Sequence, residues 1–148
     1  MKLALLVVMV AACGTDTSHA ISSDPLAGVV NGQPWSFVAG STDAFLSQNQ
    51  DDFFAVFYPS TYPACGSEPG GPHLIVSVPK STGSYDFSLS RNMTFAFDNN
   101  NDIATDGTVR VDTVTSTTLT GGLHGTFDNA NEVDGVFTLT ICAPMAAI

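Results

Sequence analysis

Basic residues are scarce in this sequence. The 148 residues include only 4 Lys and Arg against 14 Asp and Glu, a formal net charge of −10. Binding to nucleic acid, or adhesion to an anionic lipid surface, draws its affinity from clustered Lys and Arg side chains. The composition therefore argues against both of these partners, and an acidic surface that keeps the protein soluble is the simplest interpretation.

Signatures of catalysis and of zinc binding are also lacking. The three histidines, His19, His73 and His124, do not share the short spacings at which strands or helices present zinc ligands. No Gly-x-Ser-x-Gly nucleophile motif occurs. Asp51 and Asp52 are adjacent acids, but neighbours on a strand point to opposite faces and do not form a glycosidase pair. We predict that the protein is not an enzyme.

The apolar run near the start is too short to be a permanent membrane anchor. Met1 and Lys2 precede the uncharged residues 3–12, whereas a helix that spans a bilayer needs about 20 apolar residues. A charged start followed by a short apolar run is typical of a secretory signal peptide. Ordinary signal cleavage after Ala20, which would discard everything before it, is one alternative.

The end of the apolar run, Val10-Ala11-Ala12-Cys13-Gly14, resembles the lipobox of bacterial lipoproteins. The resemblance covers the first 14 residues, with Val10 where leucine is usual. It implies that Cys13 takes a diacylglycerol, that the peptide is cut before it, and that the new amino terminus is acylated, as with palmitate. Several acyl chains anchor stably where one chain is marginal. Gly14, in place of aspartate, favours the outer membrane in a Gram-negative host, with the domain facing the periplasm or the surface.

Cleavage before Cys13 divides the chain into a signal peptide (1–12), a flexible tether (13–25) and a single domain (26–148). The tether is small and polar, without an apolar pattern. The domain has the length of one hydrophobic core. The mature chain keeps three Lys and Arg against all 14 acids, a charge of −11, and we expect the domain to stand off from the membrane.

The cysteine count fits this division. If Cys13 carries lipid, Cys65 and Cys142 remain as an even pair in an oxidising compartment. We predict that they form a disulfide, which would attach a mid-chain loop to the end of the last strand.

Period-two patterns of apolar residues predict an all-β domain. Asn31-Gly32 between apolar runs is a strong hairpin signal, because both residues accept positive φ. Residues 59–72, rich in Pro and Gly, predict a rigid loop. Gly121-Gly122 and Gly125 predict a bulge or bend. We expect an antiparallel β-sandwich or small calycin-like barrel of eight or nine strands, at 26–30, 35–45, 52–58, 73–78, 85–89, 92–97 and 108–114, with a final hairpin at 119–127 and 133–141.

Two further stretches resemble small bacterial lipoproteins of unassigned function. Residues 30–35, Val-Asn-Gly-Gln-Pro-Trp, match their opening pattern. Residues 120–127, with 134–137 and Cys142, match their closing hairpin, which ends in a cysteine. The resemblance implies a β-sandwich or calycin-like barrel on a lipid tether. It brings no catalytic residue with it.

The best metal candidate is the acidic turn at 98–102. Asp98, Asn100 and Asp102 occupy positions 1, 3 and 5 of a calcium loop, and Asp106 follows closely. The pattern lacks the glycine at position 6 and the glutamate at position 12. A solvated turn explains the same residues, because Asn and Asp favour turns. A second turn of similar composition lies at 128–134.

Aromatic residues offer an alternative binding site. The domain could enclose a calycin-like cavity for a small hydrophobic ligand, walled by Phe53, Phe57, Phe95, Phe97, Phe127 and Phe137. A sugar or hydrophobic site could also use Trp35, Tyr58, Tyr62 and Tyr85, although such residues more often pack in the core.

The sequence leaves three candidate functions. The first is a non-enzymatic cell-envelope lipoprotein that serves as a structural or interaction module for an unidentified partner. The second is a binder of small hydrophobic ligands or sugars. The third is an adhesion domain stabilised by calcium, the one cofactor that the residues suggest.

Overall fold

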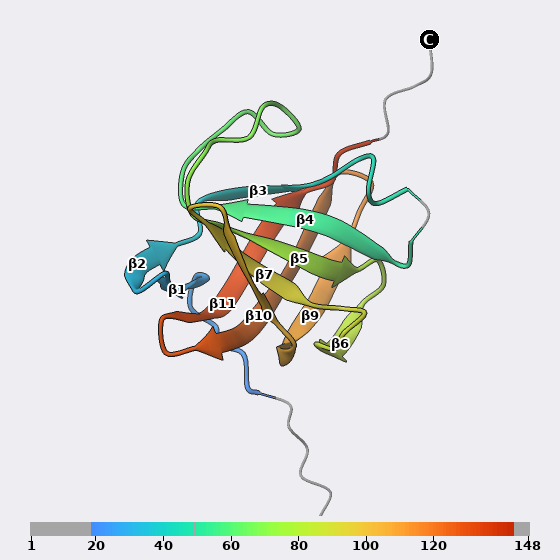
Figure 1. Cartoon of the computed structure of the whole chain (residues 1–148). Helices are drawn as coiled ribbons and strands as arrows, with labels where there is room; N and C mark the ends of the chain where they lie inside the picture. Colours follow the sequence, from blue (N-terminus) through green and yellow to red (C-terminus); the bar gives the residue numbers. More distant parts are fainter. Residues whose placement is uncertain (1–18, 49, 144–148) are drawn as a thin grey trace, which may run out of the picture.

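The computed structural model describes residues 19–48 and 50–143, and these form eleven β-strands without a helix (Figure 1). No helix in this part of the chain is therefore long and apolar enough to cross a membrane. The strands are β1 (Ala27–Val30), β2 (Gln33–Ser36), β3 (Ala39–Thr42), β4 (Asp52–Tyr58), β5 (His73–Pro79), β6 (Gly83–Asp86), β7 (Met93–Phe97), β8 (Asn100–Ala104), β9 (Asp106–Val114), β10 (Thr118–Asp128) and β11 (Asn131–Thr140).

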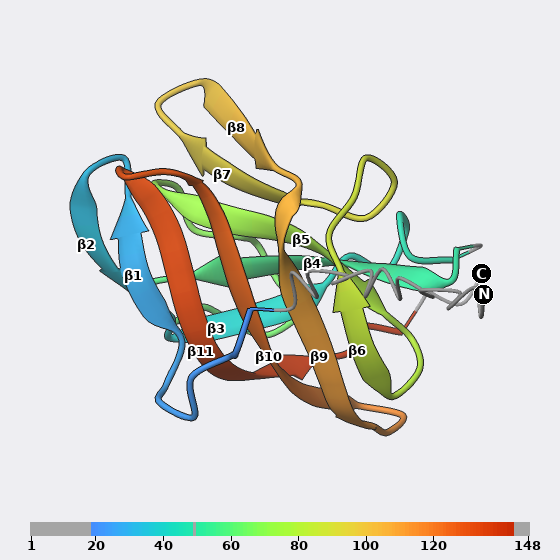
Figure 2. The same ribbon diagram turned by 90° about the horizontal axis from the view of Figure 1, so that it is seen from below.

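The strands form one curled sheet. Their order is β6-β9-β10-β11-β3-β4-β5-β7-β8, with β1 added beside β11 and β2 beside β1. Curling places β9, β10 and β11 in one layer and β4, β5 and β7 in the other (Figure 2). All pairings are antiparallel except the short contact of β11 with β3. The predicted all-β class is confirmed, in the form of a half-barrel.

Two predicted hairpins are confirmed. Asn31 and Gly32 have φ of 51° and 70° and join β1 to β2. The hairpin of β10 and β11 runs from Thr118 opposite Thr140 to Asp128 opposite Asn131. The predicted glycine bulge is present as well, because the register between β10 and β9 shifts between Thr120 and Gly121.

The predicted strand over 35–45 is wrong, because the chain changes partners inside it. The Phe37 amide donates to the carbonyl of Leu26 beside β1, whereas the Val38 amide donates to the carbonyl of Tyr58 in β4. The segment therefore splits into β2 and β3. Phe45 lies beyond β3 and its side chain is 79% exposed.

Two other boundaries differ from the prediction. The expected strand at 85–89 ends at Asp86, because Ser88 and Arg91 close a turn, and Leu89 is exposed. The expected turn at 98–102 is tighter than predicted. Asp98 and Asn99, both with positive φ, make the turn by themselves, and residues 100–104 form β8 against β7.

The core lies between the two layers. Alternate residues of β9, β10 and β11 meet residues of β4, β5 and β7, and both faces of β4 are covered, as its sequence predicted. The prediction for Phe127 is wrong: the register shifts between Thr126 and Asp128, and Phe127 is half exposed. The largest fully buried side chains are Phe57, Phe95, Leu26, Leu74, Met93, Leu119, Leu123 and Leu139.

Residues 19–25, expected as the end of a flexible tether, lie against the sheet. The Val136 amide donates to the carbonyl of Asp24, and the Leu26 amide donates to the carbonyl of Val136, at 2.8 and 2.9 Å. The Ser22 amide donates to the Asp134 carboxylate at 2.9 Å. We call residues 19–25 the N-terminal strap. The ordered domain thus begins before the predicted boundary at residue 26.

Gly135 makes room for the strap. It has a φ of 139°, and a Cβ atom there would lie 2.6 Å from the carbonyl oxygen of Asp24 and 2.6 Å from the Cα of Leu26. We expect Gly135→Ala to lower the free energy of unfolding by about 2–4 kcal/mol, from backbone strain and overpacking together. It should also increase hydrogen exchange at the Val136 amide.

Gly32→Ala is the matched control. Gly32 also has positive φ, but a Cβ atom there meets nothing within 4 Å. We expect a loss of only about 1 kcal/mol and normal exchange at Val136. Equal losses of unfolding free energy in the two variants, measured by urea denaturation, would show that the strap does not limit the space at Gly135.

Candidate functional site

The loop at 59–72 is fixed to the sheet by a disulfide. Cys65 and Cys142 are bonded, with their Cα atoms 5.6 Å apart, which confirms the predicted pair. Cys142 lies two residues beyond the end of β11, and its amide donates to the Thr42 hydroxyl at 2.9 Å. The bond closes 77 residues of chain separation, for which loss of chain entropy stabilises the fold by about 4–5 kcal/mol at most.

Aromatic side chains fix the base of the same loop. The Tyr58 ring stacks on His73 at 4.7 Å and meets the edge of Tyr62 at 5.4 Å. The Tyr58 hydroxyl donates to Glu68, and the Tyr62 hydroxyl lies 2.9 Å from that of Ser41. Two of the three tyrosines that we considered for a ligand site are therefore engaged with the loop.

Burial changes the acidity of both tyrosines. It raises the pKa of Tyr58 well above its ordinary value, and the negative charge of Glu68 raises this pKa further. Burial also raises the pKa of Tyr62, although the hydrogen bond with Ser41 opposes part of the change. The fold therefore favours the protonated form of each phenol.

A shallow apolar hollow of about 470 Å³ lies between the loop and β2. Trp35 lies at its base, only 5% exposed, and its indole nitrogen donates to the carbonyl of Pro72 at 3.3 Å. This hollow has more apolar than polar lining, which suits a hydrophobic group of a partner. Its lining residues are Val30, Gln33, Pro34, Trp35, Ser36, Val38, Pro59 and Pro72.

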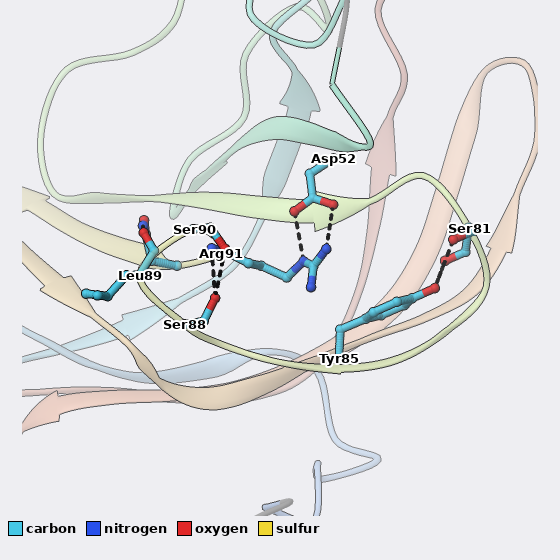
Figure 3. Close-up of polar contacts among 8 residues, drawn as sticks. Asp52, Ser81, Tyr85, Ser88, Leu89, Ser90 and Arg91 are labelled. Atoms are coloured by element: carbon cyan, nitrogen blue, oxygen red, sulfur yellow. Dashed lines mark hydrogen bonds and ion pairs between the residues drawn. The ribbon is translucent and has the colours of Figure 1, made fainter.

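A second group of polar residues surrounds Arg91 at the opposite end of β4. Its guanidinium donates from two nitrogens to the two oxygens of Asp52, at 2.8 and 3.0 Å (Figure 3). The same guanidinium lies 5.0 Å from the ring centre of Tyr85, whose hydroxyl lies 2.9 Å from that of Ser81. The hydrogen bond to Asp52 raises the pKa of Arg91 above its ordinary value.

This group borders a hollow of about 430 Å³, and the two cationic side chains that line the hollow are both held by other groups of the described chain. Lys80 also lines the hollow, and its ammonium donates to the carbonyl of Ser47 and lies over the ring of Phe53. With Arg91 held by Asp52, both cations are engaged within the protein. We interpret the group as a clamp that joins the start of β4 to the turn before β7. Sequence reasoning missed it, because Asp52 and Arg91 are 39 residues apart and no local pattern links them.

The calcium candidates lie on three successive elements, a tight turn and two strands. Asp98 lies in the tight turn, whereas Asn100 and Asp102 are on β8, where the Asp102 carboxylate accepts from the side chains of Asn100 and Asn131. Asp106 begins β9 and contacts His19 at 3.2 Å. Within residues 19–48 and 50–143, no three His, Cys, Asp or Glu side chains are grouped so that they could hold a metal ion.

The phenylalanines that we expected to wall a cavity pack against one another or leave the interior. Phe57 and Phe137 meet edge to face, with ring centres 5.0 Å apart, and Phe95 is fully buried in the same core. Phe53 and Phe97 are partly buried at its margin, and Phe127 is exposed. The hollow at Trp35 is lined in part by two residues of this core, Val30 and Trp35, and the hollow at Arg91 is lined in part by Tyr85, which packs against the core.

Two of the three histidines meet on the outer face of β10. The His19 ring, from the strap, meets that of His124 in a tilted arrangement with ring centres 4.6 Å apart, and its Nε2 lies 3.2 Å from Asp106. His124 Nδ1 is buried without a hydrogen bond, 3.9 Å from Asp134. The pair covers part of the outer face of β10. Cys13, the predicted lipid attachment, lies outside the described residues.

The Arg91 clamp has a matched control in Arg110, which makes the same two-nitrogen contact with Asp112. The acid side chains differ in exposure, 13% for Asp52 and 45% for Asp112. We expect Arg91→Gln to lower the free energy of unfolding by about 1–3 kcal/mol, because it leaves Asp52 desolvated and unpaired. Arg110→Gln should cost less than about 0.5 kcal/mol. Similar losses for both variants in urea denaturation would reject the clamp.

The raised pKa values of Tyr58 and Tyr62 predict a loss of stability at alkaline pH. Above about pH 10, the unfolded chain loses phenol protons that the folded protein keeps. Each tyrosine then lowers the free energy of unfolding by up to about 1.4 kcal/mol per pH unit until it ionises in the folded state. Tyr58→Phe should make the decline shallower. The slope of the unfolding free energy against pH is measured by urea denaturation from about pH 9 to 11. The same slope in Tyr58→Phe and in the wild type would contradict the raised pKa of Tyr58.

Comparison of the chain with protein-family models, with curated proteins and with solved structures finds no match. The functional argument therefore depends on this chain's own residues and contacts.

Proposed function

We propose that the protein is a non-enzymatic lipoprotein of the bacterial cell envelope, attached to a membrane through lipid on Cys13. Its folded domain is a structural or interaction module. Two described features, the pairing of Cys65 with Cys142 and the docking of His19, support this proposal together with the lipobox resemblance.

The disulfide is the observation that carries the proposal. Disulfides persist in oxidising compartments outside the cytoplasm, which agrees with export of the chain. The bond also uses both cysteines of the domain, and Cys13 is then the single cysteine left of the three. A lone cysteine that follows small residues at the end of an apolar run is the residue that lipidation requires.

The docked strap favours cleavage before Cys13 over cleavage after Ala20. Cleavage after Ala20 would remove His19, which covers His124 and contacts Asp106. Ile21, whose side chain lies beside Gly122 on the outer face of β10, would become the new amino terminus. Cleavage before Cys13 keeps these contacts.

The loop at 59–72 and the hollow beside Trp35 supply the surface for an interaction. The disulfide and the Tyr58 contacts hold this loop in place, so that little conformational entropy would be lost when a partner binds. The hollow offers an apolar surface in an otherwise acidic protein. A protein partner, rather than an enclosed small molecule, agrees best with a shallow hollow and a packed core.

Lipid attachment is tested by fractionation. In cells that express the full chain, we expect the wild type in the membrane pellet and Cys13→Ala in the soluble or secreted fraction, because the acyl chains supply about 0.8 kcal/mol per buried CH₂. Mass spectrometry of the purified wild type should find Cys13 as the acylated amino terminus.

Gly14→Ala serves as the control, since it keeps the cysteine and a small neighbour. Equal membrane fractions for the wild type and Cys13→Ala, or an amino terminus at Ile21, would refute the proposal.

A further inference from the structure

The strap brings ordered structure close to the predicted lipid. The His19 ring contacts that of His124 on β10, Ser22 bonds to Asp134 of β11, and Asp24 bonds to Val136 of the same strand. Ile21 fills the space over Gly122, where its Cγ2 would lie 2.8 Å from an added Cβ atom. Four successive parts of the strap thus contact one β-hairpin, on its outer face and at its edge.

Little chain is then left between the lipid and the domain. Cys13 and His19 are six residues apart, which spans about 20 Å when fully extended. A folded domain of this length is about 35 Å across. A tether fixed at His19 is therefore shorter than the domain, and the side opposite His19 cannot turn to the bilayer.

The disulfide-bonded loop lies on that opposite side. In Figure 1 the strap leaves the lower side of the molecule and the loop between β4 and β5 extends from the upper side. In Figure 2, seen from below, the strap crosses in front of β10 and β11, with β4 and β5 behind them. The two views place the strap and the loop on different layers.

We propose that the strap orients the lipid-anchored domain on the membrane. The outer face of β9, β10 and β11 next to His19 is turned to the lipid surface, and the loop at 59–72 is presented away from it. This inference rests on the proposed lipidation of Cys13, and it names the membrane-facing side and the partner-facing side of the module.

The charges near the strap indicate that the tether, rather than adhesion, sets this orientation. Asp24 belongs to the strap, Asp106 and Asp134 contact it, and Arg110 on β9 is already paired with Asp112. An acidic face of this kind has no attraction for an anionic lipid surface. Lengthening the tether should therefore abolish the orientation.

Energy transfer from two labelled positions to the membrane tests the proposal. Thr138→Cys places a donor dye on the outer face of β11, and Ser67→Cys places one on the exposed loop. The native cysteines of the domain are held in their disulfide. The purified lipidated proteins are reconstituted into phosphatidylcholine vesicles that carry an acceptor dye on the lipid headgroups. We expect transfer several-fold more efficient from position 138 than from position 67.

A longer tether supplies the control. Insertion of about twelve Gly and Ser residues between Ser18 and His19 extends the reach beyond the width of the domain, and the two efficiencies should become nearly equal. Equal transfer with the native tether, or stronger transfer from position 67, would overturn the proposal. A difference that persists with the long tether would show that the face itself adheres, which also overturns it.

Failure of the proposed function gives a separate result. If the wild type does not float with the vesicles and carries no lipid on Cys13, the lipoprotein assignment fails before orientation is measured. If the protein floats but the labels do not differ, lipid attachment stands and only the orientation is rejected.

Discussion

The hydrogen bonds along the edge of β11 opposite β10 hold this fold together. One edge of β11 pairs with β10 over the length of the final hairpin. Its other edge is shared by three segments: β1 opposite residues 132–134, the strap and Leu26 at Val136, and β3 at Thr140. Because buried backbone groups need partners, each segment satisfies a part of the edge that the others leave open. The beginning and the end of the domain thus meet on this strand.

The same constraint explains how the sheet curls. β3 is attached to β11 by a single parallel contact and to β4 by a full antiparallel ladder, so the sheet turns from one layer to the other at this point. The disulfide lies beside this point, since Cys142 lies two residues beyond the end of β11 and its amide bonds to Thr42 of β3. The covalent link thus reinforces the weakest pairing of the path and holds the loop at 59–72 above it.

Local patterns predicted what depends on neighbours in the chain. The hairpin at Asn31-Gly32 and the alternation of β10 and β11 follow from turn chemistry and burial, and the cysteine pair follows from counting. Contacts between distant segments left no such signal. The segment 35–45 splits because the Phe37 amide bonds beside β1 and the Val38 amide bonds to β4. The clamp of Asp52 with Arg91 joins residues that are 39 positions apart in the sequence. Phe127 was misplaced because a bulge after Thr126 moves it off the buried face.

The strap shows why composition misled us about the tether. Residues 19–25 are polar and lack an apolar period, which is the pattern of a flexible linker. In the structure, their polar atoms bond to β11 and to Asp106 of β9, so the polarity serves attachment rather than solvation. Under the proposed lipidation of Cys13, the twelve residues from 14 to 25 would let an acidic domain move in any orientation away from the lipid, whereas the five residues from 14 to 18 would not. The position at which the strap docks would then decide which side of the module a partner can reach.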